Sequence, residues 1–216
     1  MAQSATGAPT VCPYCWSAAR HRLLWLYLQR EMRIGETPLR VLHVAPERGL
    51  GRRIRRLSNI EYLAVDLDGR QGAMRLDVTD LPFRSEFDLV LCSHVLEHIP
   101  DDRRALAEIW RVLDVGGVAI LQHPIDRNRA ETFEDFAITS PEERERVFFQ
   151  FDHVRIYGRD IEDRFSEAGF RFERVPYIAQ VSRAERQLFL LEQEAGNLPA
   201  RNLEADVVYV CHKDAP

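Results

Sequence analysis

The sequence predicts an α/β fold in which a mostly parallel sheet carries helices on both faces. Two observations support this prediction. Short apolar runs alternate with segments of helical periodicity, and polar residues suited to ligand binding directly follow several of the apolar runs. Strands that alternate with helices form parallel sheets, whose ligands bind at the carboxyl ends of the strands. The polar residues are therefore expected to meet at one edge of the sheet.

Periodicity and turn residues assign the elements in chain order. Apolar residues at helical spacing in WSAARHRLLWLYLQREM (16–32) predict a helix that covers the main domain. Apolar runs then predict strands at 40–45, 62–66, 74–77, 87–92 and 118–123. Helices are predicted at 47–57, 101–113 and 159–168, the last of them ended by Gly169. Two further strand-like runs, at 172–178 and 206–212, flank a helix near 183–194.

Length and composition indicate one main globular domain with a small N-terminal extension. The chain has 216 residues, of which 45% are hydrophobic and 29% are charged. Residues 1–37 are predicted to form the extension, made of a tail (1–11), a CPYC segment and the covering helix. Residues 38–216 then form the α/β domain, with no internal repeat.

Charge and hydropathy argue against several classes of partner. The formal net charge of −5 disfavours nucleic-acid binding, which depends on neutralising phosphates. No apolar run approaches the roughly 20 residues that span a bilayer, and MAQSATGAPT lacks the features of a signal peptide. Four cysteines without a secretory signal suit a reducing compartment. We therefore expect a cytoplasmic monomer or homodimer that binds neither nucleic acid nor membrane.

The stretch VLHVAPERGLG (41–51) has the strand, turn and helix pattern on which nucleotide and nucleoside sites are built, but its turn lacks glycines. Pro46 removes a backbone donor, and Glu47 places a negative charge where a pyrophosphate would bind. A carboxylate there suits a ligand with a cationic end and no phosphate, such as S-adenosylmethionine. We predict that Glu47 faces the methionine end of that ligand. The alternative is that Glu47 only caps its helix.

Acidic residues follow the next two predicted strands. Asp66 ends the second strand, 17 positions after Gly49, at the usual place of a carboxylate that accepts both ribose hydroxyls. Asp77, in LDVTDLPF, ends the third strand and could meet an adenine amino group. The fourth strand continues into HVLEHIPD, and a predicted turn at Gly116-Gly117 leads into the fifth. The order and spacing of these pieces carry the prediction of a nucleoside site.

Together these residues resemble the class I S-adenosylmethionine-dependent methyltransferases over about 38–124, with a looser fit to the end. The resemblance implies a Rossmann-like, seven-stranded sheet whose last inserted strand is antiparallel. The predicted cofactor contacts are His43, Ala45, Pro46, Glu47, Gly49, Asp66, Leu67, Asp77, Val78, Ser93 and His94.

The chain departs from the usual family pattern in its first turn. His43 stands where the family usually has an acidic residue, and Ala45 and Glu47 stand at two of its glycine positions. LHVAPE, together with CPYC (12–15) and RHRLLWLYL, resembles a bacterial subgroup that has the same altered turn. The turn is therefore interpreted as a variant site.

Two motifs suggest a metal, and neither is sufficient by sequence. HVLEH (94–98) matches the H-x-x-E-H signature of inverted zinc peptidases, but that motif needs a long helix. Here it directly follows a strand, and Pro100 disfavours helix at the residue before it. CPYC is half of a zinc ribbon, which needs four ligands. We predict no bound metal, with a structural metal at 94–98 and a zinc shared between two chains as the alternatives.

A basic cluster follows the first turn, made of Arg48, Arg52, Arg53, Arg55 and Arg56. Apolar residues at 50, 54 and 57 occupy one face of the same helix, so the arginines are expected on its solvent face. A patch for an anionic substrate or an acidic carrier is the alternative.

A long connection after the fifth strand, about 123–160, is predicted to be partly helical and to cover the substrate. His153 is the first candidate for a general base, because imidazole titrates near neutral pH, and Asp126 is the second. The candidate substrate-binding residues are His123, Arg127, Arg155 and Tyr157.

The function predicted from the sequence is O- or N-methylation of a small molecule by S-adenosylmethionine in bacterial metabolism, such as modification of a specialised metabolite or a sugar. The altered turn keeps a second hypothesis open, a non-catalytic partner subunit with the methyltransferase fold. A metal-dependent hydrolase that uses HVLEH is a third.

Overall fold

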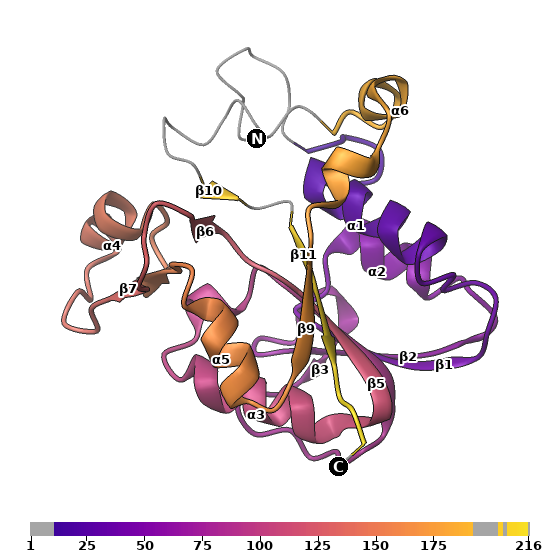
Figure 1. The fold of residues 1–216 in the computed structure, drawn as a ribbon, viewed down its shortest axis with the longest axis horizontal. Helices are drawn as coiled ribbons and strands as arrows, with labels where there is room; N and C mark the ends of the chain where they lie inside the picture. The colour runs from indigo at the N-terminus through magenta and orange to yellow at the C-terminus, as the bar shows by residue number, and fades with distance from the viewer. Residues whose placement is uncertain (1–10, 192–202, 205–206, 216) are drawn as a thin grey trace.

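The computed structural model describes residues 11–191, 203–204 and 207–215. Its centre is a seven-stranded sheet in the order β3-β2-β1-β4-β5-β11-β9 (Figure 1). The strands from β3 to β5 run parallel, while β11 is antiparallel to both of its neighbours. The predicted α/β class, the seven strands and the antiparallel inserted strand are confirmed.

The strands of this sheet lie close to their predicted positions. They are β1 (Leu39–Val44), β2 (Ile60–Asp66), β3 (Met74–Arg75), β4 (Phe87–Ser93), β5 (Leu113–Gln122), β9 (Arg171–Val175) and β11 (Val208–His212). β3 is shorter than predicted. β9 ends before Pro176, which has no N–H to donate to the ladder, and a 3-10 turn (η3, Tyr177–Gln180) follows.

The predicted turn at Gly116-Gly117 falls inside β5, which begins at Leu113, before the predicted start at 118. Gly116 has a φ of 80°, and the pairing of β5 with β4 shifts register between Phe87 and Leu89. A left-handed glycine of this kind makes a local irregularity in a strand without ending it. β5 therefore begins as soon as α3 stops.

Helices cover both faces of the sheet, as predicted, and Figure 1 shows them on its two sides. α1 (Ala19–Arg30) and α2 (Arg48–Ile54) pack on one apolar cluster, while α3 (Asp102–Val112) and α5 (Ile161–Glu167) pack on the other. α6 (Arg183–Leu188) is shorter than the predicted helix, whose last residues lie outside the described part of the chain.

The segment after β5 is partly helical, as predicted. It contains α4 (Pro141–Phe148) and three two-residue strands, β6 (Ile125–Asp126), β7 (Phe133–Glu134) and β8 (Arg155–Ile156). β7 pairs with β8, and β6 pairs with β10 (Leu203–Glu204). In the described residues, no helix combines the length and the apolar character that a membrane crossing needs.

Candidate functional site

The site lies where the sheet changes its direction of winding. β1 pairs with β2 on one side and with β4 on the other, so the crossovers from these strands leave in opposite directions. Such a switch point opens a crevice beyond the carboxyl ends of the strands. The predicted cofactor residues follow β1, β2, β3 and β4 at this edge.

The turn after β1 is built without a glycine at its tightest point. Ala45 has a φ of 47°, in the left-handed region that favours glycine, and its N–H donates to the Val65 carbonyl at 2.7 Å. The bond to β2 holds the strained residue in place. Ala45 therefore keeps the backbone shape that a glycine normally supplies here.

Glu47 stands at the N-terminal end of α2, but its side chain makes no capping hydrogen bond. The carboxylate instead pairs with His43, whose Nε2 lies 3.0 Å from Oε2 and whose Nδ1 lies 3.0 Å from the Tyr62 hydroxyl. Nε2 of His21, from α1, lies 3.7 Å from Oε1. Glu47 is thus the N-cap residue of α2, but its carboxylate is used by the histidines and makes no capping hydrogen bond. The two unusual residues of the turn, His43 and Glu47, are partners of each other.

The two groups that neighbour each other at this turn have shifted pKa values. Burial raises the pKa of Glu47, but the hydrogen bond from His43 and the charges of His43 and His21 outweigh it and lower the value to about 2. Burial lowers the pKa of His21 to about 4, against the opposing attraction of Glu47. At neutral pH Glu47 is ionised and His21 is neutral.

Gly49 lies against the N-terminal segment. A Cβ at this position would be 2.6 Å from the Cys15 carbonyl oxygen and 3.3 Å from the Ser17 side chain. The absence of a side chain thus lets the CPYC segment pack on α2. Gly49 therefore has a packing role, and its predicted cofactor contact stays a prediction.

The acidic residues after β2 and β3 both shape their own turns. Asp66 Oδ1 accepts the N–H groups of Asp68 and Arg70 at 2.9 and 3.0 Å. Asp77 Oδ1 accepts the N–H and the hydroxyl of Thr79, each at 2.8 Å. Of their predicted neighbours, Leu67 is exposed and the Val78 side chain is buried in the core. Only backbone atoms of residue 78 are thus available to a ligand.

The loop after β4 begins with another strained residue. Ser93 is buried with its hydroxyl 3.4 Å from Gln122 Oε1, and His94 has a φ of 53°. A single 3-10 turn, η2 (Leu96–His98), follows. HVLEH is therefore not part of a helix, and the geometry of an inverted zinc peptidase is absent. The hydrolase hypothesis loses its basis.

Buried polar atoms without hydrogen-bond partners gather behind this loop. In the described residues they include both carboxylate oxygens of Glu97, Nε2 of His94, Nε2 of Gln122 and both ring nitrogens of His123. Glu97 is 1% exposed and His123 is 3% exposed. Burial lowers the pKa of His123 to about 4, so it is neutral at pH 7. Buried groups in proteins are nearly always partnered, so this cluster marks a place for a ligand or ordered water.

The two candidate bases lie in different surroundings. His153 Nδ1 lies 3.2 Å from the Phe148 carbonyl oxygen, and its ring packs edge-on against His98. Burial lowers the pKa of His153. Asp126, in β6, accepts the Asn128 N–H at 3.1 Å and faces Arg129. Only His153 comes near the polar cluster behind the β4 loop.

Two of the predicted substrate-binding residues, Arg155 and Tyr157, point into the protein and anchor the segment that covers the site. Arg155 is 1% exposed and donates to backbone carbonyls of Leu96, Ile99 and Pro100. Tyr157 is completely buried and donates to Asp102 at 2.7 Å. The prediction that Arg155 and Tyr157 contact the substrate is therefore wrong. Both side chains are buried and form hydrogen bonds with polar groups inside the protein, as buried polar groups must. Arg127 pairs with Glu162 at 3.3 Å.

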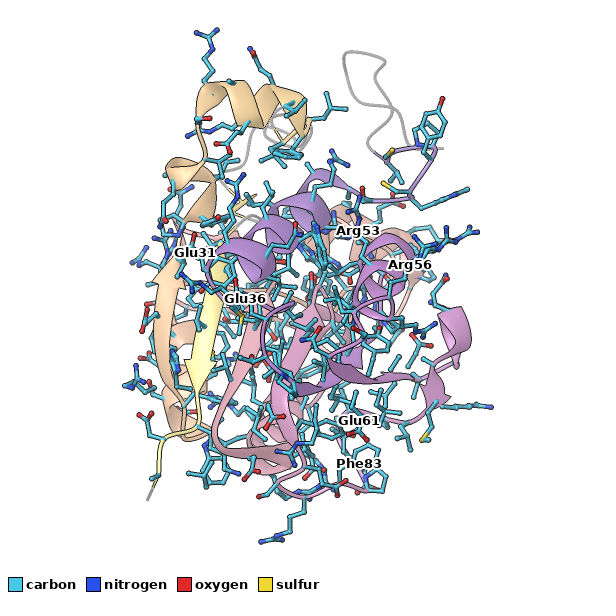
Figure 2. The ribbon with its side chains drawn as sticks, turned by 90° about the vertical axis from the view of Figure 1, so that its right-hand side faces the viewer. Glu31, Glu36, Arg53, Arg56, Glu61 and Phe83 are labelled. Carbon is cyan, nitrogen blue, oxygen red and sulfur yellow. The ribbon has the colours of Figure 1, made fainter. Side chains whose placement is uncertain are left out.

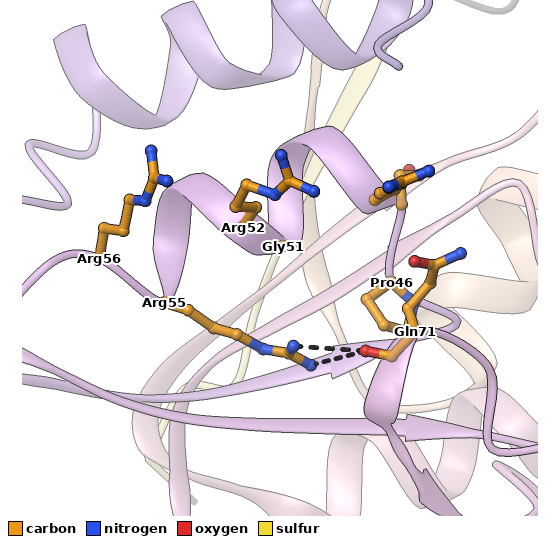
Figure 3. Close-up of a pocket in the computed structure, with 8 residues that line it drawn as sticks. Pro46, Gly51, Arg52, Arg55, Arg56 and Gln71 are labelled. Atoms are coloured by element: carbon orange, nitrogen blue, oxygen red, sulfur yellow. Dashed lines mark hydrogen bonds between the residues drawn. The ribbon is translucent and has the colours of Figure 1, made fainter. Parts of the chain in front are cut away.

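The basic cluster on α2 faces solvent, as predicted, while Leu50 and Ile54 lie in the core. Figure 2 labels Arg53 and Arg56 of this cluster. Beside the turn, four of the arginines line a pocket of about 460 Å³ (Figure 3). The Arg55 guanidinium donates to the Gln71 carbonyl across this pocket. Pro46 and Glu47 of the turn line the same pocket, and an anionic ligand there stays the open alternative.

The cysteines of CPYC join no group of three metal ligands in the described residues. Cys15 Sγ lies 2.9 Å from the Ser17 hydroxyl, and both Cys12 and Cys15 are partly exposed. Cys92 and Cys211 are buried in strands.

Comparison with known proteins agrees with this architecture. Residues 49–121 match the model of a family described as methyltransferase domain. The 2-methyl-6-phytyl-1,4-hydroquinone methyltransferase 1 of Oryza sativa subsp. japonica is 34% identical over 87 residues, which make up 37% of this chain and 26% of the rice protein. The alignment thus spans about a quarter of the curated relative.

Solved structures match over most of the chain. The [4+2]-cyclase SpnF has a TM-score of 0.60 at 16% identity, over 94% of this chain and 85% of its own. An S-adenosylmethionine-dependent methyltransferase from Archaeoglobus fulgidus has a TM-score of 0.54 at 16% identity, over 88% and 93%. The chain has the class I methyltransferase fold. At these identities the structural likeness establishes the fold alone.

The sequence missed four residues of the site. Glu97 and His98 carried a signal, the HVLEH motif, but it was set aside as a metal site because no long helix was expected there. Gln122 and His21 carried none, since an amide at a strand end and a histidine in an amphipathic helix are common. Their partners come from distant elements.

Proposed function

We propose that the chain is an S-adenosylmethionine-dependent methyltransferase. The observation that carries the proposal is the row of carboxylates, Glu47, Asp66 and Asp77, along the carboxyl edge of β1, β2 and β3 at the switch point. The methyltransferase-domain match over 49–121 covers two of the three, and the rice and Archaeoglobus proteins are both named as methyltransferases. A row of this sign favours a cationic nucleoside over a dinucleotide.

In this proposal each carboxylate has one role. Asp66 accepts the ribose hydroxyls, and the residues at 77–78 meet the adenine. Glu47 Oε1, which is 3.7 Å from His21, faces the ammonium group of the methionine end, while Oε2 stays bound to His43. Residues 43–49, Leu67, Ser93 and His94 complete the cofactor crevice.

The acceptor is proposed to be a small molecule, methylated on oxygen or nitrogen, as in bacterial specialised or sugar metabolism. The name of the rice relative, a hydroquinone methyltransferase, supports a small-molecule acceptor. His153 is the preferred base, because it is the predicted candidate that lies beside the polar cluster at the β4 loop. We propose a cytoplasmic monomer or homodimer that needs no nucleic acid or membrane.

Calorimetry tests the cofactor assignment. Asp66→Ala should weaken S-adenosylmethionine by about 1.5–3 kcal/mol, the range for hydrogen bonds to charged groups. Asp68→Ala, in the same exposed turn, is the matched control and should bind normally. Because a pyrophosphate would meet Glu47, NAD should not bind measurably. Equal affinity of a folded Asp66→Ala variant would remove the ribose role, and tight NAD binding would overturn the cofactor.

The second candidate is a protein of this fold that transfers no methyl group. The structural likeness to a [4+2]-cyclase favours keeping it, since that protein is named for a different reaction. Transfer of a labelled methyl group from S-adenosylmethionine to small-molecule extracts separates the two. Binding of the cofactor without transfer to any acceptor would favour the second candidate.

A further inference from the structure

Three side chains from two distant segments converge behind the β4 loop. Glu97 and His98 belong to η2, and His153 lies 55 residues further along, just before β8. One potential ligand atom from each lies within 4.8 Å of the others. We propose that Glu97, His98 and His153 bind a divalent first-row transition-metal ion, of which Zn²⁺ suits the set best.

The backbone fixes the position of the distant histidine. The Val154 N–H donates to the Glu97 carbonyl at 3.0 Å. Arg155, buried next to it, donates to the carbonyls of Leu96 at 2.9 Å and Pro100 at 2.8 Å. These bonds join the start of β8 to both ends of η2. The convergence of the three ligands is therefore held by the fold.

Outer contacts leave one nitrogen of each histidine for the metal, so His153 binds the ion here instead of acting as the base considered under the proposed function. His153 Nδ1 lies 3.2 Å from the Phe148 carbonyl oxygen, so it carries the proton and Nε2 keeps its lone pair. His98 Nδ1 lies 3.4 Å from Asp152 Oδ2. A second acceptor that orients each ring in this way is the usual support of a metal-bound histidine.

The buried carboxylate of Glu97 requires a partner. Its side chain is 1% exposed, and no group in the described residues hydrogen-bonds to either carboxylate oxygen. His94 Nδ1 approaches Oε1 at 3.3 Å without the geometry of a hydrogen bond. A buried anion without a donor is costly, and a cation between it and two imidazoles removes that cost.

The donor set indicates the class of metal. Two imidazoles and one carboxylate are the ligands of three-residue zinc sites, whereas Mg²⁺ and Ca²⁺ prefer oxygen. Metal–ligand bonds of about 2.1 Å place tetrahedral ligand atoms ~3.3 Å apart, so a contraction on the order of 1 Å closes the site. Three protein ligands leave a further position open to an exogenous oxygen or nitrogen. The ion would lie on the loop that carries Ser93 and His94, next to the proposed cofactor.

Cobalt substitution of the metal-stripped full chain tests the site. Cys12→Ser/Cys15→Ser is the background, so that CPYC cannot bind the ion. One Co²⁺ per chain should produce visible absorption, Zn²⁺ should displace it, and Mg²⁺ should not. His153→Gln should weaken Co²⁺ by at least ~100-fold and Asp152→Asn by ~10-fold. His212→Gln, a histidine on β11, should bind like the background.

The inference is overturned if the cysteine-free background binds no Co²⁺, or if His153→Gln binds it unchanged. Because His153 is partly exposed, its variant should remain folded, and thermal unfolding checks this. S-adenosylmethionine affinity measured on the same samples separates the two proposals. Metal binding without cofactor binding would refute the proposed function alone, and cofactor binding without metal would refute only this inference.

Discussion

Two neighbouring loops of the crevice each place a histidine beside a glutamate, but the two carboxylates differ in their hydrogen bonding. The turn after β1 joins His43 to Glu47, and the loop after β4 places His94 beside Glu97. Each loop contains a non-glycine residue in the left-handed region, Ala45 in the first and His94 in the second. In the first loop the carboxylate has a hydrogen bond, whereas in the second it has none within the described part of the chain.

The difference lies in what packs around each pair. His43 is fully buried between Tyr62 and Glu47, with each ring nitrogen 3.0 Å from a partner oxygen. The first pair is therefore complete in the folded chain. Glu97 is as deeply buried, but neither of its carboxylate oxygens has a hydrogen-bond partner among the described residues. A satisfied pair stabilises the fold, whereas an unsatisfied one indicates a bound ligand.

The largest expected contrast is in stability. Glu47→Gln should lower the free energy of unfolding by about 1.5–3 kcal/mol, because a charge-assisted hydrogen bond from His43 is lost. Glu97→Gln, which loses no such bond, should cost less than about 1 kcal/mol without metal. Urea unfolding measures both, and equal losses would erase the distinction between the loops.

The acid sensitivity of the first loop should follow its two shifted groups. The pKa of Glu47 is about 2 in the fold against 4.5 without it, so its contribution is complete above pH 4.5 and is lost as the pH falls toward 2. The pKa of His21 is about 4 against 6.5, so its contribution is lost between pH 6.5 and 4. Stability measured against pH should flatten in the lower window in Glu47→Gln and in the upper one in His21→Gln. An unchanged profile would contradict the pairing.

The smallest expected effect concerns backbone strain. Ala45→Gly should raise the free energy of unfolding by up to about 1 kcal/mol, since relief of the left-handed strain exceeds the added entropy of the unfolded chain. Ala64→Gly, in the regular strand β2, is the control and should destabilise by about 0.5–1 kcal/mol. Destabilisation by Ala45→Gly would mean that the bond to Val65 leaves little strain to relieve.

Local sequence patterns were enough to predict the order of strands and helices and the residues at the strand ends. Apolar periodicity and turn residues act over a few neighbours, so they place Asp66 at the end of β2 without knowledge of the rest of the fold. The same local rules placed the start of β5 after Gly116-Gly117, because a glycine inside a strand and a glycine in a loop look alike.

The partners of the site residues depend on how distant elements pack together. His43 could be identified as unusual, but its bonds to Tyr62 and Glu47 depend on how β2 packs beside β1. The sequence placed Arg155 among the substrate-binding residues of the cover. In the fold its side chain is buried and donates to the carbonyls of Leu96 and Pro100. His153 meets Glu97 because β8 docks on η2. Contacts between segments this far apart follow from packing, which local periodicity does not encode.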